Sequence, residues 1–219
     1  FIGEETGIDN TTYTRTFQAG NFYLPLFLPF NISISDIKSS LGSSCKISQL
    51  KGINYNDGTI VLNWLTVESG QLNANTPYIV KLESQASQIE ATNVTFAKDR
   101  ITVNGNFQDN GCTLTLTGVY LPEQLTKGDG KYVLTKNNSF QQAGSDLVLN
   151  PYRFYLSFTT PTGQAKIKMN VDGEENQDAL ESIFYTEGEG DNIYYDLNGR
   201  RVENPSNGIF ITNGKKVLF

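Results

Sequence analysis

The chain has 219 residues and a formal net charge of −6, with 18% charged, 38% hydrophobic and 11% aromatic residues. Because it has no histidine and only two cysteines, the usual Ser-His-Asp and Cys-His nucleophile systems and a four-ligand structural zinc site are excluded. The acidic balance, with no stripe of Lys and Arg, also argues against nucleic acid as a partner.

The composition favours strands and tight turns, because Thr and aromatic residues suit a pleated sheet while Gly and Asn accept positive φ. The first strongly apolar segment is FYLPLFLPF, residues 22–30. Pro25 and Pro29 each remove a ladder donor from it. We therefore expect either a buried strand interrupted by a bulge or an edge strand that other elements cover.

The segment NYNDGT, residues 54–59, carries side-chain oxygens at alternate positions, as calcium loops do. The distal glutamate of such a loop is missing, since Trp64 stands at that position. A hairpin turn on Asp57-Gly58 is therefore the stronger hypothesis. In the TIVLNWLTV segment that follows, Ile60, Leu62 and Trp64 share one face, which predicts a buried Trp64.

Further turn signals occur at 68–70, 104–105, 109–111 and 128–130, and period-two segments alternate with them. The segments CTLTLTGVYL, RFYLSF and QAKIKMNV each have one apolar face. We expect one core to contain Leu114, Leu116, Phe154, Leu156, Phe158, Ile167, Met169 and Val171. Residues 1–171 are thus predicted to form an all-β domain, an antiparallel sandwich or a flattened barrel, with less than about a tenth of the chain in helix.

The two cysteines, Cys45 and Cys112, leave two interpretations open. They form one disulfide in an exported protein, or they are two small buried apolar residues.

The last fifth of the chain differs from the rest. Residues 172–191 contain eight acidic residues and no Lys or Arg, which predicts an extended, solvated linker. Residues 192–219 contain Asn198-Gly199 and Asn213-Gly214, which suit tight hairpin turns, and Asn207-Gly208, which suits a looser one. A small C-terminal β-hairpin unit is expected there.

Several segments resemble a known group of proteins. YTRTFQAGNFYLPLFLPFNI, VESGQLNANTPYIVKL, LTGVYLPEQL and NPYRFYLSF resemble, in this order, a β domain of secreted and surface proteins of the Bacteroidales. The ending IYYDLNGRRVENPSNGIFITNGKKVLF resembles the short C-terminal modules of the same proteins, which are similar to the sorting domains of type IX secretion. This resemblance implies an extracellular or outer-surface location, and contact with secretion machinery through residues 192–219.

We therefore expect a non-catalytic exported module, binding or structural, with a role related to adhesion and a sorting-like tail. The alternative is a carbohydrate-binding module that assists an attached glycan-degrading enzyme. No cofactor, metal or membrane span is expected, and the expected ligand is a glycan or a host or surface protein. Tyr155 and Arg153 share a strand face and are the candidate ligand-binding residues.

Overall fold

The computed structural model describes residues 9–94, 96, 103–143, 147–163 and 165–175 and, nearer the C-terminus, the backbone of four short strands. The chain divides into two compact units, Phe1–Ser182 and Ile183–Phe219, which we call the body and the C-terminal unit. The described fold is all-β, as predicted, with one helix of eight residues. No helix among the described residues has the length and apolarity to cross a membrane.

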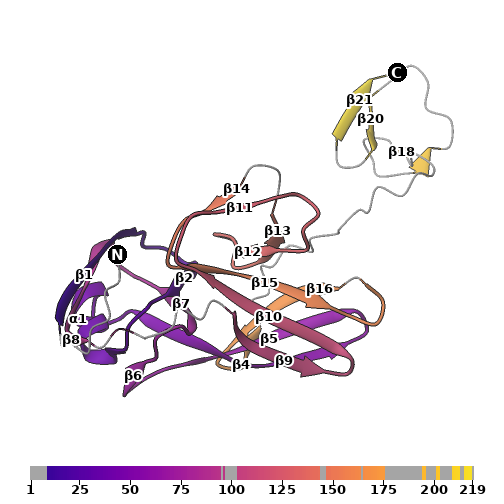
Figure 1. The fold of residues 1–219 in the computed structure, drawn as a ribbon. Coiled ribbons are helices and arrows are strands. Elements are labelled where there is room, and N and C mark those ends of the chain that lie inside the picture. The colour runs from indigo at the N-terminus through magenta and orange to yellow at the C-terminus, as the bar shows by residue number, and fades with distance from the viewer. Residues whose placement is uncertain are drawn as a thin grey trace. The chain divides into compact units, whose positions relative to one another are not determined.

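The larger sheet of the body has six strands (Figure 1). In order across the sheet they are β17 (Glu174–Glu175), β16 (Lys166–Val171), β5 (Thr59–Thr66), β4 (Lys46–Asn56), β7 (Pro77–Lys81) and β2 (Leu24–Phe27). All neighbours run antiparallel except β16 and β5, which are parallel, with Met169 opposite Leu62. The sequence predicts antiparallel pairs only. A parallel pair arises here because the chain builds a second sheet between β5 and β16 instead of returning through a tight turn.

That second sheet has five strands, and they face the first sheet (Figure 1). In order they are β13 (Phe140–Gln142), β12 (Tyr132–Leu134), β15 (Arg153–Thr159), β10 (Cys112–Val119) and β9 (Val103–Asp109). Each described sheet has two open ends in its strand order. The body is therefore a sandwich, and the flattened barrel considered from the sequence is not formed by the described strands.

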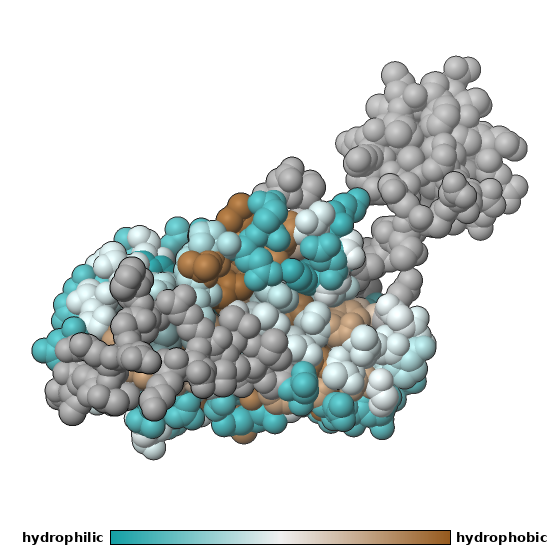
Figure 2. Space-filling model, in the orientation of Figure 1, coloured by the Kyte–Doolittle hydropathy of each residue, from teal (hydrophilic) through white to brown (hydrophobic). Residues whose placement is uncertain are grey.

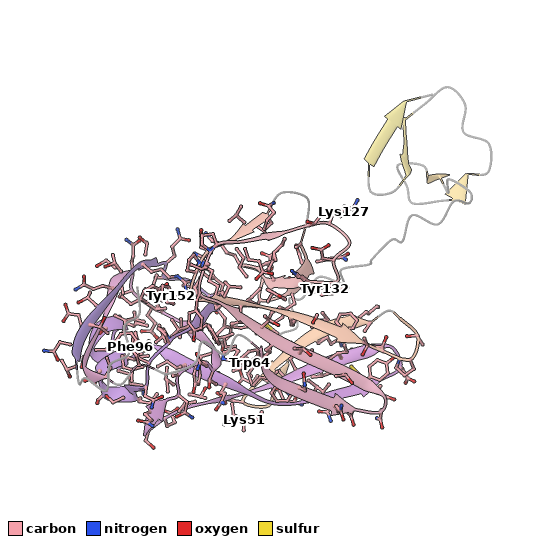
Figure 3. The ribbon with its side chains drawn as sticks, viewed as in Figure 1. Lys51, Trp64, Phe96, Lys127, Tyr132 and Tyr152 are labelled. Atoms are coloured by element: carbon pink, nitrogen blue, oxygen red, sulfur yellow. The ribbon has the colours of Figure 1, made fainter. Side chains whose placement is uncertain are left out.

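One core fills the space between the two sheets. It contains the seven predicted residues Leu114, Leu116, Phe154, Leu156, Ile167, Met169 and Val171, and Phe158 packs against it at its margin. Trp64 is fully buried in this core, between the sheets, and its ring centroid lies 6.1 Å from that of Phe154 (Figure 3). These predictions are confirmed. The opposite face of β5 is more open, since Leu65 is 48% exposed.

A second core lies under two further strand pairs and the helix. The pairs are β1 (Asp9–Phe17) with β8 (Ala86–Val94), and β3 (Ile32–Ser33) with β6 (Gln71–Leu72). Helix α1 (Ile34–Leu41) begins where Ser33 Oγ accepts a hydrogen bond from the Asp36 N–H at 3.0 Å. Ile34, Ile37 and Leu41 turn into this core. A helix of only two turns is too short to be recognised from hydrophobic periodicity in the sequence.

A small third layer covers the outer face of β15. It is the pair β11 (Glu123–Leu125) with β14 (Leu147–Leu149), above a cluster formed by Val119, Leu125, Ala143, Leu149 and Tyr155. Figure 2 shows apolar surface in this region, where the Val148 side chain is 48% exposed.

The predicted turns are mostly present. Asp57 and Gly58 both have positive φ and join β4 to β5, and Asn110 and Gly111 join β9 to β10 in the same way. The hairpin hypothesis for residues 54–59 is therefore confirmed. The turn predicted at residues 104–105 is wrong, because both residues lie within β9, at a bulge between the partners of Thr115 and Leu116.

The proline-containing segment supplies an edge strand, as one of the two hypotheses had it. β2 is the last strand of the six-stranded sheet, and the Phe27 N–H donates to the Tyr152 carbonyl at 3.1 Å. The edge is thus covered by the chain that leads into β15. Cys45 and Cys112 are free thiols buried in different cores, so the disulfide interpretation is wrong.

The acidic stretch begins within the body. Asp172 and Gly173, both with positive φ, form a turn that returns β17 along β16, with Val171 opposite Glu174. The remainder of the predicted linker, 176–191, lies outside the described residues.

In the C-terminal unit the strands are β18 (Tyr194–Tyr195), β19 (Arg201–Val202), β20 (Ile209–Thr212) and β21 (Lys215–Leu218). They form one antiparallel sheet in the order β19-β18-β20-β21, and Thr212 lies opposite Lys215. The three Asn-Gly pairs themselves lie outside the described residues.

Candidate functional site

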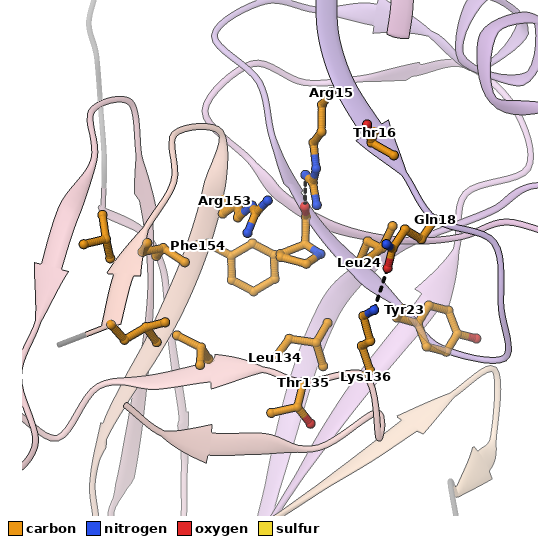
Figure 4. Close-up of a pocket in the computed structure, with 15 residues that line it drawn as sticks. Arg15, Thr16, Gln18, Tyr23, Leu24, Leu134, Thr135, Lys136, Arg153 and Phe154 are labelled. Atoms are coloured by element: carbon orange, nitrogen blue, oxygen red, sulfur yellow. Dashed lines mark hydrogen bonds between the residues drawn. The ribbon is translucent and has the colours of Figure 1, made fainter. Parts of the chain in front are cut away.

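The body contains a groove of about 420 Å³ that we call the arginine groove (Figure 4). Its volume falls in the range of roughly 300–1,000 Å³ that is usual for small-molecule sites. The groove lies where β1 and the start of β2 meet β12, β14 and β15, so segments from both ends of the body line it. Its lining includes Arg15, Leu24, Pro25, Leu134, Arg153 and Phe154.

Arg15 reaches the groove from β1, where Tyr13, Arg15 and Phe17 share a face by alternation. Its guanidinium lies over the Phe17 ring at 4.8 Å, and one Nη donates to the Pro25 carbonyl at 2.7 Å. Its Nε is enclosed and has no acceptor among the described residues. Arg15 is therefore held in place by contacts that leave part of its donor set unused.

Arg153 is the first residue of β15 and lies opposite Val119 of β10. Its Nε is likewise enclosed without an acceptor among the described residues. The guanidinium groups of Arg15 and Arg153 point toward the same part of the groove, near Pro25 (Figure 4). No aspartate or glutamate is among the described residues that line the groove.

The two guanidinium groups are close enough to affect each other. Burial lowers the pKa of Arg15, the phenol of Tyr13 opposes that change, and the positive charge of Arg153 adds to it. Burial raises the pKa of Tyr13, against the influence of Arg15 and Arg153. Because the arginine guanidinium is so strong a base, the lowered pKa still leaves Arg15 charged at neutral pH. The groove therefore holds two like charges without a carboxylate from its described lining.

Comparison with known proteins gives no match: no family model, no curated protein and no solved structure.

Tyr152, the neighbour of Arg153, has an unusual backbone. Its φ is +61°, a conformation that costs a bulky residue on the order of 1–3 kcal/mol. Two backbone hydrogen bonds hold it there, from its own N–H to the Val119 carbonyl at 2.7 Å and from the Phe27 N–H to its carbonyl. Its ring packs edge-on against Tyr13, with 4.7 Å between centroids. This strained turn fixes the point at which Arg153 enters the groove.

The rim of the groove is polar. Lys136 donates a hydrogen bond to the Gln18 side chain across the groove, and its ammonium lies 5.5 Å from the centroid of the Phe22 ring (Figure 4). Thr16 and Thr135 add hydroxyl groups to the lining. The interior is apolar, with Leu24, Pro25, Leu134 and Phe154 among its walls. The arrangement suits a compact anion with both apolar and hydroxyl-bearing surface.

The two residues chosen from the sequence have different positions. Arg153 lies in the groove, but Tyr155 is only 8% exposed and belongs to the cluster under β11 and β14, with the Lys131 ammonium 4.9 Å from its ring centroid. Tyr155 was chosen as a surface residue, and the structure buries it because a third layer covers that face of β15. Arg15 was missed. The only signal for it is a lone cation among threonines and aromatic residues in TTYTRTF.

Within the described residues, no group of three or more Asp, Glu or Cys side chains is arranged to hold a metal ion.

Proposed function

We propose that the chain is a non-catalytic binding module of an exported protein and that its ligand is an anion held in the arginine groove. The observation that carries this proposal is Arg153. It is a cation with an enclosed, unpaired Nε, it lies beside a second cation, and no carboxylate is found among the described groove residues. Such an arrangement costs folding free energy unless a ligand completes it.

Export and surface location are supported by the resemblance of five segments to Bacteroidales surface proteins, namely residues 13–32, 67–82, 116–125, 150–158 and 193–219. The hairpin of β20 and β21, with two residues between Thr212 and Lys215, is compatible with a compact sorting-like module. In this proposal the C-terminal unit serves the secretion machinery, and the body supplies the binding surface.

A second candidate function is a carbohydrate-binding module that serves an attached glycan-degrading enzyme. It is favoured by the combination of apolar walls with the hydroxyl and amide side chains of Thr16, Gln18 and Thr135 around the groove. Sugars present both kinds of surface.

Titration calorimetry of the intact chain with a panel of anions tests the binding function. The panel contains phosphate, sulfate, citrate, glucuronate and a short peptide with a free C-terminus. We expect at least one to bind, and Arg153→Gln to weaken it by at least about tenfold, as loss of a charge-assisted hydrogen bond does.

Lys51→Gln is the matched control for the loss of one positive charge. Lys51 is exposed on β4 and lies well away from Tyr152, the neighbour of Arg153 (Figure 3). Equal binding by wild type and Arg153→Gln, or no binding to any probe, would refute the groove as a ligand site and leave a structural spacer.

A further inference from the structure

We infer that the arginine groove selects the carboxylate of an acidic sugar, such as a uronic or sialic acid residue. This inference rests on the proposed binding function and specifies its ligand.

The charge and surroundings of the groove favour a carboxylate over a phosphate. Arg15 already donates one hydrogen bond to the Pro25 carbonyl. The two guanidinium groups together therefore have fewer free N–H donors than two complete bidentate contacts would need. A carboxylate needs only one guanidinium for a bidentate contact, which consists of two parallel N–H···O hydrogen bonds. The walls contributed by Leu24, Leu134 and Phe154 are apolar. A dianionic phosphate loses more hydration on entering such surroundings than a monoanionic carboxylate does, because the Born cost of burial rises with the square of the charge.

The strand beside the groove argues against an extended peptide as the ligand. A peptide would bind most simply by adding a strand to the outer edge of β2. Pro25 has no N–H, its carbonyl already accepts from Arg15, and the Phe27 N–H is already bonded to Tyr152. The edge therefore has few backbone groups left for a new strand.

The polar groups at the rim match a sugar ring instead. Thr16, Gln18 and Lys136 provide hydroxyl, amide and ammonium groups within one small opening, whereas the Thr135 hydroxyl is already bonded to Ser139. These are the groups that bind sugar hydroxyls, while the apolar walls accept the C–H face of the ring. The carboxylate between Arg15 and Arg153 then fixes the orientation of the ring.

The test compares glucuronate with its uncharged amide, glucuronamide, and with glucose 6-phosphate on the intact chain. We expect glucuronate to bind at least about tenfold more tightly than the amide, and more tightly than the phosphate. Arg153→Lys keeps the positive charge but loses the planar guanidinium that can bind a carboxylate in bidentate geometry. We therefore expect its affinity for glucuronate to fall by at least about tenfold. Lys51→Gln should remain within about twofold of wild type, because Lys51 lies outside the groove.

The outcomes separate the two proposals. Tighter, Arg153-dependent binding of glucose 6-phosphate would overturn the choice of carboxylate while leaving the groove as an anion site. Tighter binding of the free peptide carboxylate would overturn the choice of sugar. Absence of Arg153-dependent binding for all of these probes would overturn both. If the Arg153 variants do not fold, the comparison of glucuronate with its amide on the wild-type chain still decides, since equal affinities refute the inference.

Discussion

Asp172 accepts two hydrogen bonds from Thr66, one from the backbone N–H at 2.8 Å and one from the hydroxyl at 2.6 Å. Thr66 ends β5 and Asp172 follows β16, so these bonds fasten the C-terminal ends of the two parallel strands to each other. They lie at the start of the acidic stretch. This stretch therefore contributes its first carboxylate to the body.

The bonds from Thr66 give Asp172 a defined pH dependence. The hydroxyl and N–H of Thr66 lower the pKa of Asp172 in the folded chain. Since the folded pKa lies below the unfolded value of about 3.9, the stabilisation is complete above that value and is lost as the pH falls through the folded pKa. Asn suits the positive φ at this position, so Asp172→Asn removes the charge without backbone strain.

We expect Asp172→Asn to lower the free energy of unfolding by about 0.5–1 kcal/mol at pH 7, because the site is exposed. The difference from wild type should shrink toward pH 2–3, since Asp172 is then increasingly protonated in both states. Urea titrations at pH 7 and at low pH measure it. A difference independent of pH would contradict this role of the carboxylate.

Two shortened chains test where the body ends. A chain ending after Glu175 keeps the Thr66 bonds and β17, so its thermal midpoint should stay within about 2 °C of the intact chain. A chain ending after Val171 loses both and should melt several degrees lower. In a native host that exports the protein, both should remain inside the cell if residues 192–219 act as a sorting module. Unfolding of the longer of the two chains would show that the C-terminal unit is part of the body's stability.

The core face of β15 offers a direct test of packing. Leu156 is fully buried, so Leu156→Ala should lower the free energy of unfolding by about 2–5 kcal/mol. Leu121, which is 69% exposed, is the control, and Leu121→Ala should change it by less than about 0.5 kcal/mol. A loss of similar size for both variants would mean that the assignment of faces is wrong.

Gly118 of β10 permits a close approach between the sheets. A Cβ added there would lie 2.3 Å from the nearest atoms of the Phe27 ring, which is fully buried and cannot move away. Gly118→Ala should therefore cost about 1–3 kcal/mol of unfolding free energy through overpacking. At Gly52 of β4 an added Cβ meets no atom within 4 Å, and Gly52→Ala should be neutral or slightly stabilising. Equal effects in denaturant titrations would exclude the steric explanation.

Arg153 should show a trade-off between binding and stability. Replacing it with Met keeps an apolar stem and removes the unpaired Nε and the repulsion with Arg15. We expect Arg153→Met to raise the free energy of unfolding of the ligand-free chain by about 0.5–1 kcal/mol while abolishing anion binding. Calorimetric melting of the ligand-free protein measures the first effect. A marked drop in the thermal midpoint would identify Arg153 as a structural residue instead.

Much of the sandwich could be predicted from alternation along single strands. Leu156 and Met169 alternate with polar neighbours, and Trp64 lies in a strand with apolar residues on both faces, so burial on one side followed directly. Alternation is local, however, and does not say which strands pair. The parallel pairing of β16 with β5 depends on contacts between residues about a hundred positions apart, and no pattern within either strand encodes it.

The site was only partly predictable for the same reason. The sequence placed Arg153 and Tyr155 on one face of a strand, which the register of β15 supports. It gave no sign that β11 and β14 cover Tyr155, nor that Arg15 of a distant strand lies beside Arg153. Asn104-Gly105 shows a further limit. An Asn-Gly pair suits a hairpin turn, yet here the surrounding sheet imposes a bulge, because pairing with β10 continues on both sides of it.

The late arrival of β16 has a consequence for synthesis of the protein. β4 and β5 form a hairpin as soon as they are made, but Thr59 pairs with Lys166, far later in the chain. At translation rates of about 5–20 residues per second, the outer edge of β5 waits on the order of 5–20 s for its neighbour. Throughout that interval one edge of β5 in the nascent chain has no partner strand. An open strand edge is a template for pairing with another chain, so protection of β5 depends on completing the chain through Val171.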